Sequence, residues 1–155
     1  MKYSFIRHIA CTAAIACATL ASHALDVNHF APSSRLAQGR WVKVAISQTG
    51  MYEINRQQLA EMGLNDPTQV RIYGYGGKML NEVLTNDLPD DLQQVPAMRQ
   101  DDKVCFYGVG NVLMTLKGGT NYPLYTRERN TYSQQGYYFL TDEAIDPVLE
   151  SQSVP

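Results

Sequence analysis

The chain consists of short apolar runs that glycine, proline or acidic turns interrupt every few residues. In the run at 41–46, Val42, Val44 and Ile46 occupy alternate positions, which is the two-residue period of a strand with one buried face. The run at 103–107 is almost continuously apolar and ends at Gly108. It is therefore predicted to be a central strand, covered on both faces. Runs of this kind predict a mainly β fold.

Further strands are predicted at 51–54, 70–73, 112–116 and 137–141. Gly50 stands where a positive φ would be tolerated, so 51–54 is interpreted as the return strand of a hairpin with 41–46. Residues 86–102 are acidic, amide-rich and interrupted by two prolines, which indicates a loop or at most an irregular edge. Residues 122–132 are interpreted as a tyrosine-containing loop. The irregular spacing of the strands favours a β-sandwich-like domain over a repeat array.

One short helix is predicted to begin after Asn55. Gln58 stands three residues further on, as in a capping box, and Ile54 can pack onto Leu59 as a hydrophobic staple. Gly63 suits the C-terminal cap, and the Asp-Pro pair that follows prevents continuation. The helix is therefore expected to have about two turns.

The first residues are typical of an export signal. Two basic residues precede the uncharged stretch 9–21, which is too short to span a membrane as a helix and leads into the small-x-small pattern Ser22-His23-Ala24. Residues 1–24 are thus predicted to be a signal peptide, followed by an irregular leader at 25–38. An alternative interpretation makes Cys17 a lipidated first residue. Either version places the protein in the periplasm, at the outer membrane or on the cell surface.

Cleavage after Ala24 would also change the charge and the thiol content. It removes Lys2 and Arg7, so 13 basic residues become 11 against 15 acidic ones, and the formal charge changes from −2 to −4. Nucleic acid is therefore not expected as a partner. Cys105 would remain as the only thiol, which excludes an internal disulfide.

Several separated motifs occur in one order: WVKV at 41, TGMY at 49, RIYGYGGKML at 71, DDKVCFYGVG at 101 and QQGYYFLT at 134. Together they resemble the amino-terminal region of PorU-like type IX secretion sortases, in the gingipain class of cysteine peptidases. The resemblance implies a β-rich domain at 39–147. In that family a peptidase domain with a His/Cys catalytic pair follows this region. The whole protein cuts carboxy-terminal sorting signals from cargo at the outer membrane of Bacteroidetes and joins the new terminus to a surface lipopolysaccharide.

The resemblance also implies what this chain does. It stops at Pro155, where the family's peptidase domain would be expected to start, so 148–155 is interpreted as a tail and the gene as truncated or split. The implied function is an exported, non-catalytic accessory domain whose partners are a peptidase domain or other secretion components. No transmembrane segment is expected in the mature chain. The alternative is a standalone exported module that binds protein or glycan.

Cys105 is the residue most easily taken for a nucleophile. Such a cysteine needs an accessible thiolate beside a histidine, whereas Cys105 lies within an apolar strand without a basic neighbour, and His29 lies in the leader. A small buried hydrophobic role is predicted instead.

Other patterns also have a structural interpretation that we prefer. The glycines after 70–73 match neither a dinucleotide fingerprint nor a Walker loop, so a tight turn is predicted. The acidic residues could ligate calcium, but they lack EF-hand spacing and are interpreted as solvated turns. Three tyrosines could form a binding surface or cover a sheet edge. No catalytic, cofactor-binding or metal-binding residue is therefore assigned. The residues weighed in these two groups are Asp87, Asp90, Asp91, Asp101 and Asp102, and Tyr122, Tyr125 and Tyr132.

Overall fold

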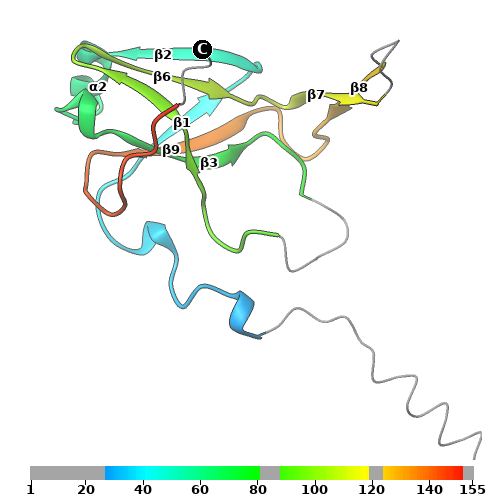
Figure 1. Ribbon diagram of the computed structural model, residues 1–155, viewed down its shortest axis with the longest axis horizontal. Helices are drawn as coiled ribbons and strands as arrows, with labels where there is room; N and C mark the ends of the chain where they lie inside the picture. Colours follow the sequence, from blue (N-terminus) through cyan, green and yellow to red (C-terminus); the bar gives the residue numbers. More distant parts are fainter. Residues whose placement is uncertain (1–26, 81–87, 119–123, 152–155) are drawn as a thin grey trace, which may run out of the picture.

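The computed structural model describes residues 27–80, 88–118 and 124–151, and Figure 1 shows a mainly β domain from which one hairpin projects. The predicted signal peptide, its cleavage site and Cys17 lie outside these residues. Within them, none of the helices is long and apolar enough to cross a membrane. The domain boundaries at 39 and 147 stay predictions.

Two antiparallel sheets make up the body of the domain, which confirms the predicted β-sandwich-like class. The first sheet has the strand order β1 (Val42–Ile46), β9 (Gly136–Thr141), β3 (Arg71–Gly76) and β4 (Gln94–Val95). The second sheet has the order β2 (Gly50–Asn55), β6 (Lys103–Gly108) and β5 (Ala97–Gln100). The predicted central position of the strand at 103–107 is confirmed, because β6 lies between two neighbours.

The predicted hairpin between the first two strands is wrong. β1 pairs with β9, and β2 pairs with β6, so the chain passes from one sheet to the other between Ile46 and Gly50. Hydrogen bonds to residues that follow β6 hold this crossing in place. The Thr49 hydroxyl donates to the Val112 carbonyl at 2.7 Å and accepts from the Gly110 amide at 3.0 Å. Gly50 is not in the positive-φ region and lies opposite Gly108 in the ladder.

The core lies between the two sheets. Phe106 is 2% exposed, and its ring meets that of Tyr138 edge-on, with centroids 5.3 Å apart. Cys105 is also buried, but Tyr107 is 54% exposed, so the prediction that both faces of this strand are covered is wrong at Tyr107. The cluster of buried side chains is Ile46, Leu59, Leu64, Val70, Ile72, Ala97, Val104, Phe106, Tyr138 and Leu140.

The predicted helix is confirmed as α2 (Arg56–Glu61), with the capping box of Asn55 and Gln58 formed in both directions. At its other end, Gly63 has φ +79° and donates to the Ala60 carbonyl, and Leu64 donates to the Leu59 carbonyl. This pair of bonds is a Schellman cap, which only a residue at ease with positive φ closes without strain. It turns the buried Leu64 into the core.

The acidic stretch forms sheet edges, so of the two predicted alternatives the edge applies at 94–100. β4 lies at the edge of the first sheet and β5 at the edge of the second, with Pro96 between them. Beyond β5, the Ala97 amide donates to the Leu149 carbonyl, and the Ser151 amide donates to the Ala97 carbonyl. The first residues of the predicted tail therefore run along this edge.

Short 3-10 turns complete the body. The predicted leader contains η1 (Val27–His29) and η2 (Arg35–Ala37), and η3 (Pro67–Gln69) precedes β3. The leader is tied to the body by side chains: the Ala31 amide donates to the Asp90 carboxylate at 2.5 Å, and the Arg35 amide donates to the Asp91 carboxylate at 2.7 Å.

The predicted tight turn at the glycine cluster is instead a bulge inside β3. Gly74 and Tyr75 together lie opposite the single residue Tyr138 of β9. Gly74 has φ +139° and Gly76 has φ +66°. A Cβ at Gly76 would collide with the carbonyl of Val109 and the hydroxyl of Tyr138. Gly76 is therefore needed where β3 packs closely against Tyr138 of β9 and the segment that follows β6.

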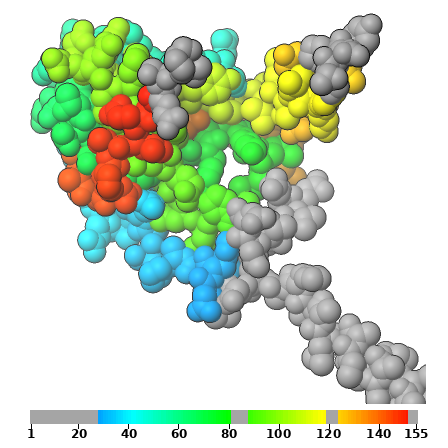
Figure 2. All heavy atoms as spheres, viewed as in Figure 1, coloured from blue at the N-terminus to red at the C-terminus, as the bar shows by residue number. Residues whose placement is uncertain are grey.

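The chain also forms a two-stranded hairpin of β7 (Val112–Lys117) and β8 (Leu124–Arg129). The prediction of a strand at 112–116 is confirmed, whereas the predicted loop at 122–132 is wrong for 124–129. β8 has no alternating apolar face, and most of its side chains are exposed, so no two-residue hydrophobic period marked it. Figure 2 shows the hairpin, coloured yellow and orange, standing off the body of the domain.

Candidate functional site

Cys105 was the candidate nucleophile, and the structure places it beside a carboxylate. Its Sγ lies 3.7 Å from Oε2 of Glu53, and the Lys103 ammonium donates to the same carboxylate oxygen at 2.9 Å. Burial, followed by the negative charge of Glu53, raises the pKa of the Cys105 thiol, although the Lys103 charge opposes this. The predicted absence of a basic neighbour is therefore wrong, since Lys103 is one.

The Lys103 ammonium does not activate the thiol, because it forms an ion pair with the Glu53 carboxylate. The hydrogen bond and charge of Lys103 hold the pKa of the Glu53 carboxyl below its usual range, so the carboxylate that faces the sulfur is ionised. A negative neighbour disfavours a thiolate. His29 instead stacks edge-on against Phe30 in the leader, with ring centroids 5.6 Å apart, and is not among the groups that shift the pKa of Cys105.

The acidic residues have structural contacts in two separate places. Asp90 and Asp91 bind backbone amides of the leader, and the backbone carbonyl of Asp102 accepts from the Arg56 amide at 2.7 Å. Arg56 also donates to the Asp101 carbonyl. Asp87 lies outside the described residues. In the part of the chain that is described, no group of three or more His, Cys, Asp or Glu side chains is placed to hold a metal ion.

The two sides of the β7–β8 hairpin carry different sets of side chains. Residues that lie opposite one another in an antiparallel pair point to the same side. Val112 lies opposite Arg129, Met114 opposite Arg127, and Leu116 opposite Tyr125. We call these six residues the basic face of the hairpin. The other side carries Leu113, Thr115, Lys117, Leu124, Thr126 and Glu128.

The basic face is apolar as well as charged. Met114 is 63% exposed, Leu116 is 56% exposed and Tyr125 is 61% exposed. Neither Arg127 nor Arg129 forms an ion pair with any described residue. Large exposed apolar side chains beside unpaired arginines are the composition of a protein-binding surface.

A groove of about 450 Å³ lies where the basic face meets the body. Met114 and Arg127 line it from the hairpin, and Tyr107 lines it from β6. Tyr107 lies opposite Met51, which is 70% exposed, so the apolar surface continues from the hairpin onto the outer face of the second sheet.

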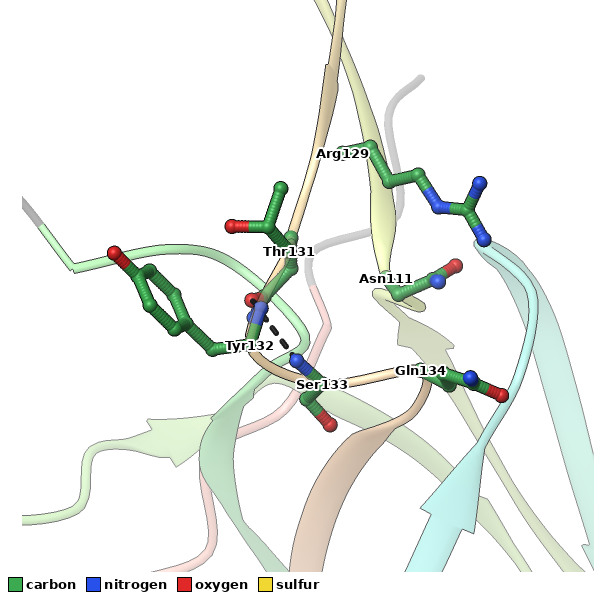
Figure 3. Close-up of a pocket in the computed structure, with 7 residues that line it drawn as sticks. Asn111, Arg129, Thr131, Tyr132, Ser133 and Gln134 are labelled. Atoms are coloured by element: carbon green, nitrogen blue, oxygen red, sulfur yellow. Dashed lines mark hydrogen bonds between the residues drawn. The ribbon is translucent and has the colours of Figure 1, made fainter.

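A second hollow, of about 390 Å³, lies at the base of the hairpin (Figure 3). Its polar lining includes Asn111, Arg129 and Gln134. Asn130 stabilises the backbone there. Its side chain accepts from the Tyr132 and Ser133 amides and donates to the Gly77 carbonyl at 3.0 Å. Tyr132 is 91% exposed, and in Figure 3 its ring points away from Arg129 and Gln134, so it does not close the hollow.

The three predicted binding tyrosines therefore do not form one surface. Tyr125 belongs to the basic face, Tyr132 stands apart at the base of the hairpin, and Tyr122 lies outside the described residues. The sequence analysis missed Arg127 and Arg129, because the tyrosine-containing segment was interpreted as a loop. Because β8 has no hydrophobic period, no local signal in the sequence paired these arginines with the apolar residues of β7.

Searches with family models and among curated proteins find no match to the chain. Among solved structures, the crystal structure of dimeric latent PorU from Porphyromonas gingivalis is similar, with a TM-score of 0.68 and 38% sequence identity over 86% of this chain. The matched part is 12% of the PorU chain. The predicted resemblance is thus confirmed: most of this chain is a PorU-like region.

Proposed function

We propose that this chain is an exported, non-catalytic accessory domain of a type IX secretion sortase, which acts at the outer membrane or cell surface. The observation that carries the proposal is the likeness to PorU, at 38% identity over 86% of the chain. The matched part is a small share of PorU, so the sortase reaction itself is assigned to other parts of such a protein. This chain's task is to fold beside the peptidase domain and to bind protein.

The surroundings of Cys105 support the non-catalytic part of the proposal. A cysteine peptidase needs a thiolate that a histidine has activated. The pKa of Cys105 is raised by burial and by Glu53, and the thiol donates to that carboxylate rather than to a histidine. A sulfur held in this way is a poor nucleophile.

The ties at the ends of the domain support the structural part. Asp146 accepts from the Tyr73 hydroxyl at 2.7 Å and forms an ion pair with Arg35 of the leader. Its backbone carbonyl accepts from the buried Arg71 side chain at 2.5 Å. One residue therefore holds the leader, β3 and the last described segment together, so the relative directions of these segments are set by the fold.

A chimaera tests the proposal. The part of Porphyromonas gingivalis PorU that matches this chain would be replaced by the corresponding residues of this chain, and cleavage of a carboxy-terminal sorting signal from a secreted cargo would be measured in cells. The expected result is a stable chimaera that retains cleavage, while replacement by an unrelated β-sandwich of similar size abolishes it. A chimaera that is exported and stable but does not process cargo would refute the shared role.

A standalone protein- or glycan-binding module is the second candidate, which the exposed rings of Tyr125 and Tyr132 favour. Exposed tyrosines offer a flat apolar surface with a polar tip. This candidate predicts that the chain binds soluble glycans or a separate protein without any sortase, and that the chimaera fails. Isothermal titration with a panel of oligosaccharides would detect the glycan version.

A further inference from the structure

We propose that the basic face of the hairpin binds an extended polypeptide segment in which carboxylates alternate with apolar side chains. This inference deepens the proposed function and rests on it only in assuming that the domain works by binding protein. It begins from the hairpin itself, which has only two strands. A hairpin of two strands is marginally stable in water, and a third strand or a packed face is what stabilises it.

The hairpin obtains little stabilisation from the rest of the described chain. Its two strands pair only with each other, so the outer backbone groups of both β7 and β8 have no strand partner among the described residues. None of its residues belongs to the buried core cluster. An extended segment can supply both missing elements, because it offers backbone groups to an open edge and side chains to a face.

The positive charge of the hairpin indicates that the segment it binds is acidic. The two strands carry Lys117, Arg127 and Arg129 against Glu128 alone, a net charge of +2 in a chain whose formal charge is −2. Both arginines lie on the basic face, and Glu128 lies on the opposite side. The planar guanidinium group binds carboxylates with two parallel hydrogen bonds. Acidic groups on the partner would therefore pair with both arginines.

The spacing of the face suits an extended partner. Arg127 and Arg129 are two residues apart on one strand, and Met114 and Val112 lie opposite them on the other. A strand also repeats every two residues, so carboxylates on one face of the partner come into register with the two arginines. The apolar residues of a partner paired along the open edge of β8 would then point to the opposite side of the hairpin, which carries Leu113 and Leu124.

An anionic membrane is the other surface that two arginines and apolar residues could bind, and the shape of the site favours a polypeptide. The groove is concave and is bounded by the hairpin on one side and by Tyr107 and the 47–49 crossing on the other. A flat bilayer surface does not reach into such a groove, whereas a single extended chain does.

The test uses the processed chain and a fluorescein-labelled peptide that alternates glutamate with valine and leucine, with a lysine-for-glutamate peptide as its control. Fluorescence anisotropy is measured at low and at raised salt. We expect the acidic peptide alone to bind, and salt to weaken it. Arg127→Glu should lower the affinity ~10-fold or more, because a like charge then faces the peptide.

Lys117→Glu is the matched control, since it makes the same change of charge on the opposite side of the same hairpin. It should lower the affinity by less than ~2-fold, and both variants should have the thermal melting curve of the wild type because both sites are exposed. An equal loss in the two variants would overturn the inference, because binding would then depend on overall charge and not on this face.

Three further outcomes would also overturn it: no binding of the acidic peptide by the wild type, binding of phosphatidylglycerol vesicles that Arg127→Glu removes while the peptide does not bind, or a dimer in sedimentation that Arg127→Glu dissociates without peptide binding. Each of these would leave the proposed accessory role to be decided by the PorU chimaera. A failed chimaera with peptide binding intact would instead refute the accessory role and retain the binding site.

Discussion

Replacing Phe106 with alanine should be among the most damaging single changes in the body of this domain. The side chain is 2% exposed and meets two aromatic rings, those of Tyr138 at 5.3 Å and Tyr52 at 5.9 Å between centroids. Removing the ring from water contributes about 1.5–3 kcal/mol, and each aromatic pair adds roughly 0.5–1.5 kcal/mol. With the cavity that is left behind, Phe106→Ala should cost about 3–5 kcal/mol.

Equilibrium unfolding in urea measures this cost directly, as a fall in the free energy of unfolding at an unchanged slope. The expected loss is a large share of the roughly 5–15 kcal/mol that stabilises a typical domain. Tyr125→Ala is the matched aromatic control: that ring is 61% exposed on the hairpin, so the change should cost under about 1 kcal/mol. A wild-type curve for Phe106→Ala, together with an unfolded Tyr125→Ala protein, would show that the core has been assigned to the wrong residues.

Three further predictions follow from the body of the domain. The pKa of the Cys105 thiol is raised by burial and by a neighbouring carboxylate. At neutral pH this cysteine should therefore react with a disulfide reagent at least ~10-fold more slowly in the folded chain than in the urea-unfolded chain. The purified chain should also show no thiol-dependent hydrolysis of a peptide panel. Burial, followed by the hydrogen bond and charge of Asp146, raises the pKa of Tyr73 from 10.0 to about 12. Tyr73 therefore ionises first in the unfolded chain, and stability is lost as the pH rises from 10.0 to about 12. This loss should be smaller in Tyr73→Phe, which urea midpoints measured across that pH range would show. Gly76→Ala should destabilise the domain by more than about 1 kcal/mol in thermal unfolding, since φ is +66° there and the new Cβ would collide with backbone. A variant as stable as the wild type, or more stable, would mean that the bulge relaxes freely.

Local signals predicted the helix well because all of its determinants lie within a few residues of one another. The capping box joins Asn55 to Gln58, and the Schellman cap at Gly63 closes onto Ala60. Such contacts depend on sequence separation of three to five residues, which a reader of the sequence sees directly. The same holds for the existence of most strands, since a two-residue period is also local.

Strand pairing was not predictable in the same way. The alternation in β1 tells which of its faces is buried but not that its partner is β9, close to a hundred positions further along the chain. A short turn between two apolar runs favours a hairpin, and only the contacts of Thr49 with Val112 and Gly110 show why the chain changes sheet instead. The glycine cluster was misread for a related reason, because the need for Gly76 comes from Val109 and Tyr138.

The division between body and hairpin explains why the binding surface left so weak a signal in the sequence. Core residues are marked by hydrophobic period, because burial on one face is what produces that period. Five of the six residues of the basic face are exposed, and the hairpin contributes nothing to the core cluster, so folding of the body does not select their pattern. Substitutions there should therefore change binding while leaving the free energy of unfolding of the body nearly unchanged. That independence allows Arg127→Glu to separate a loss of partner from a loss of fold.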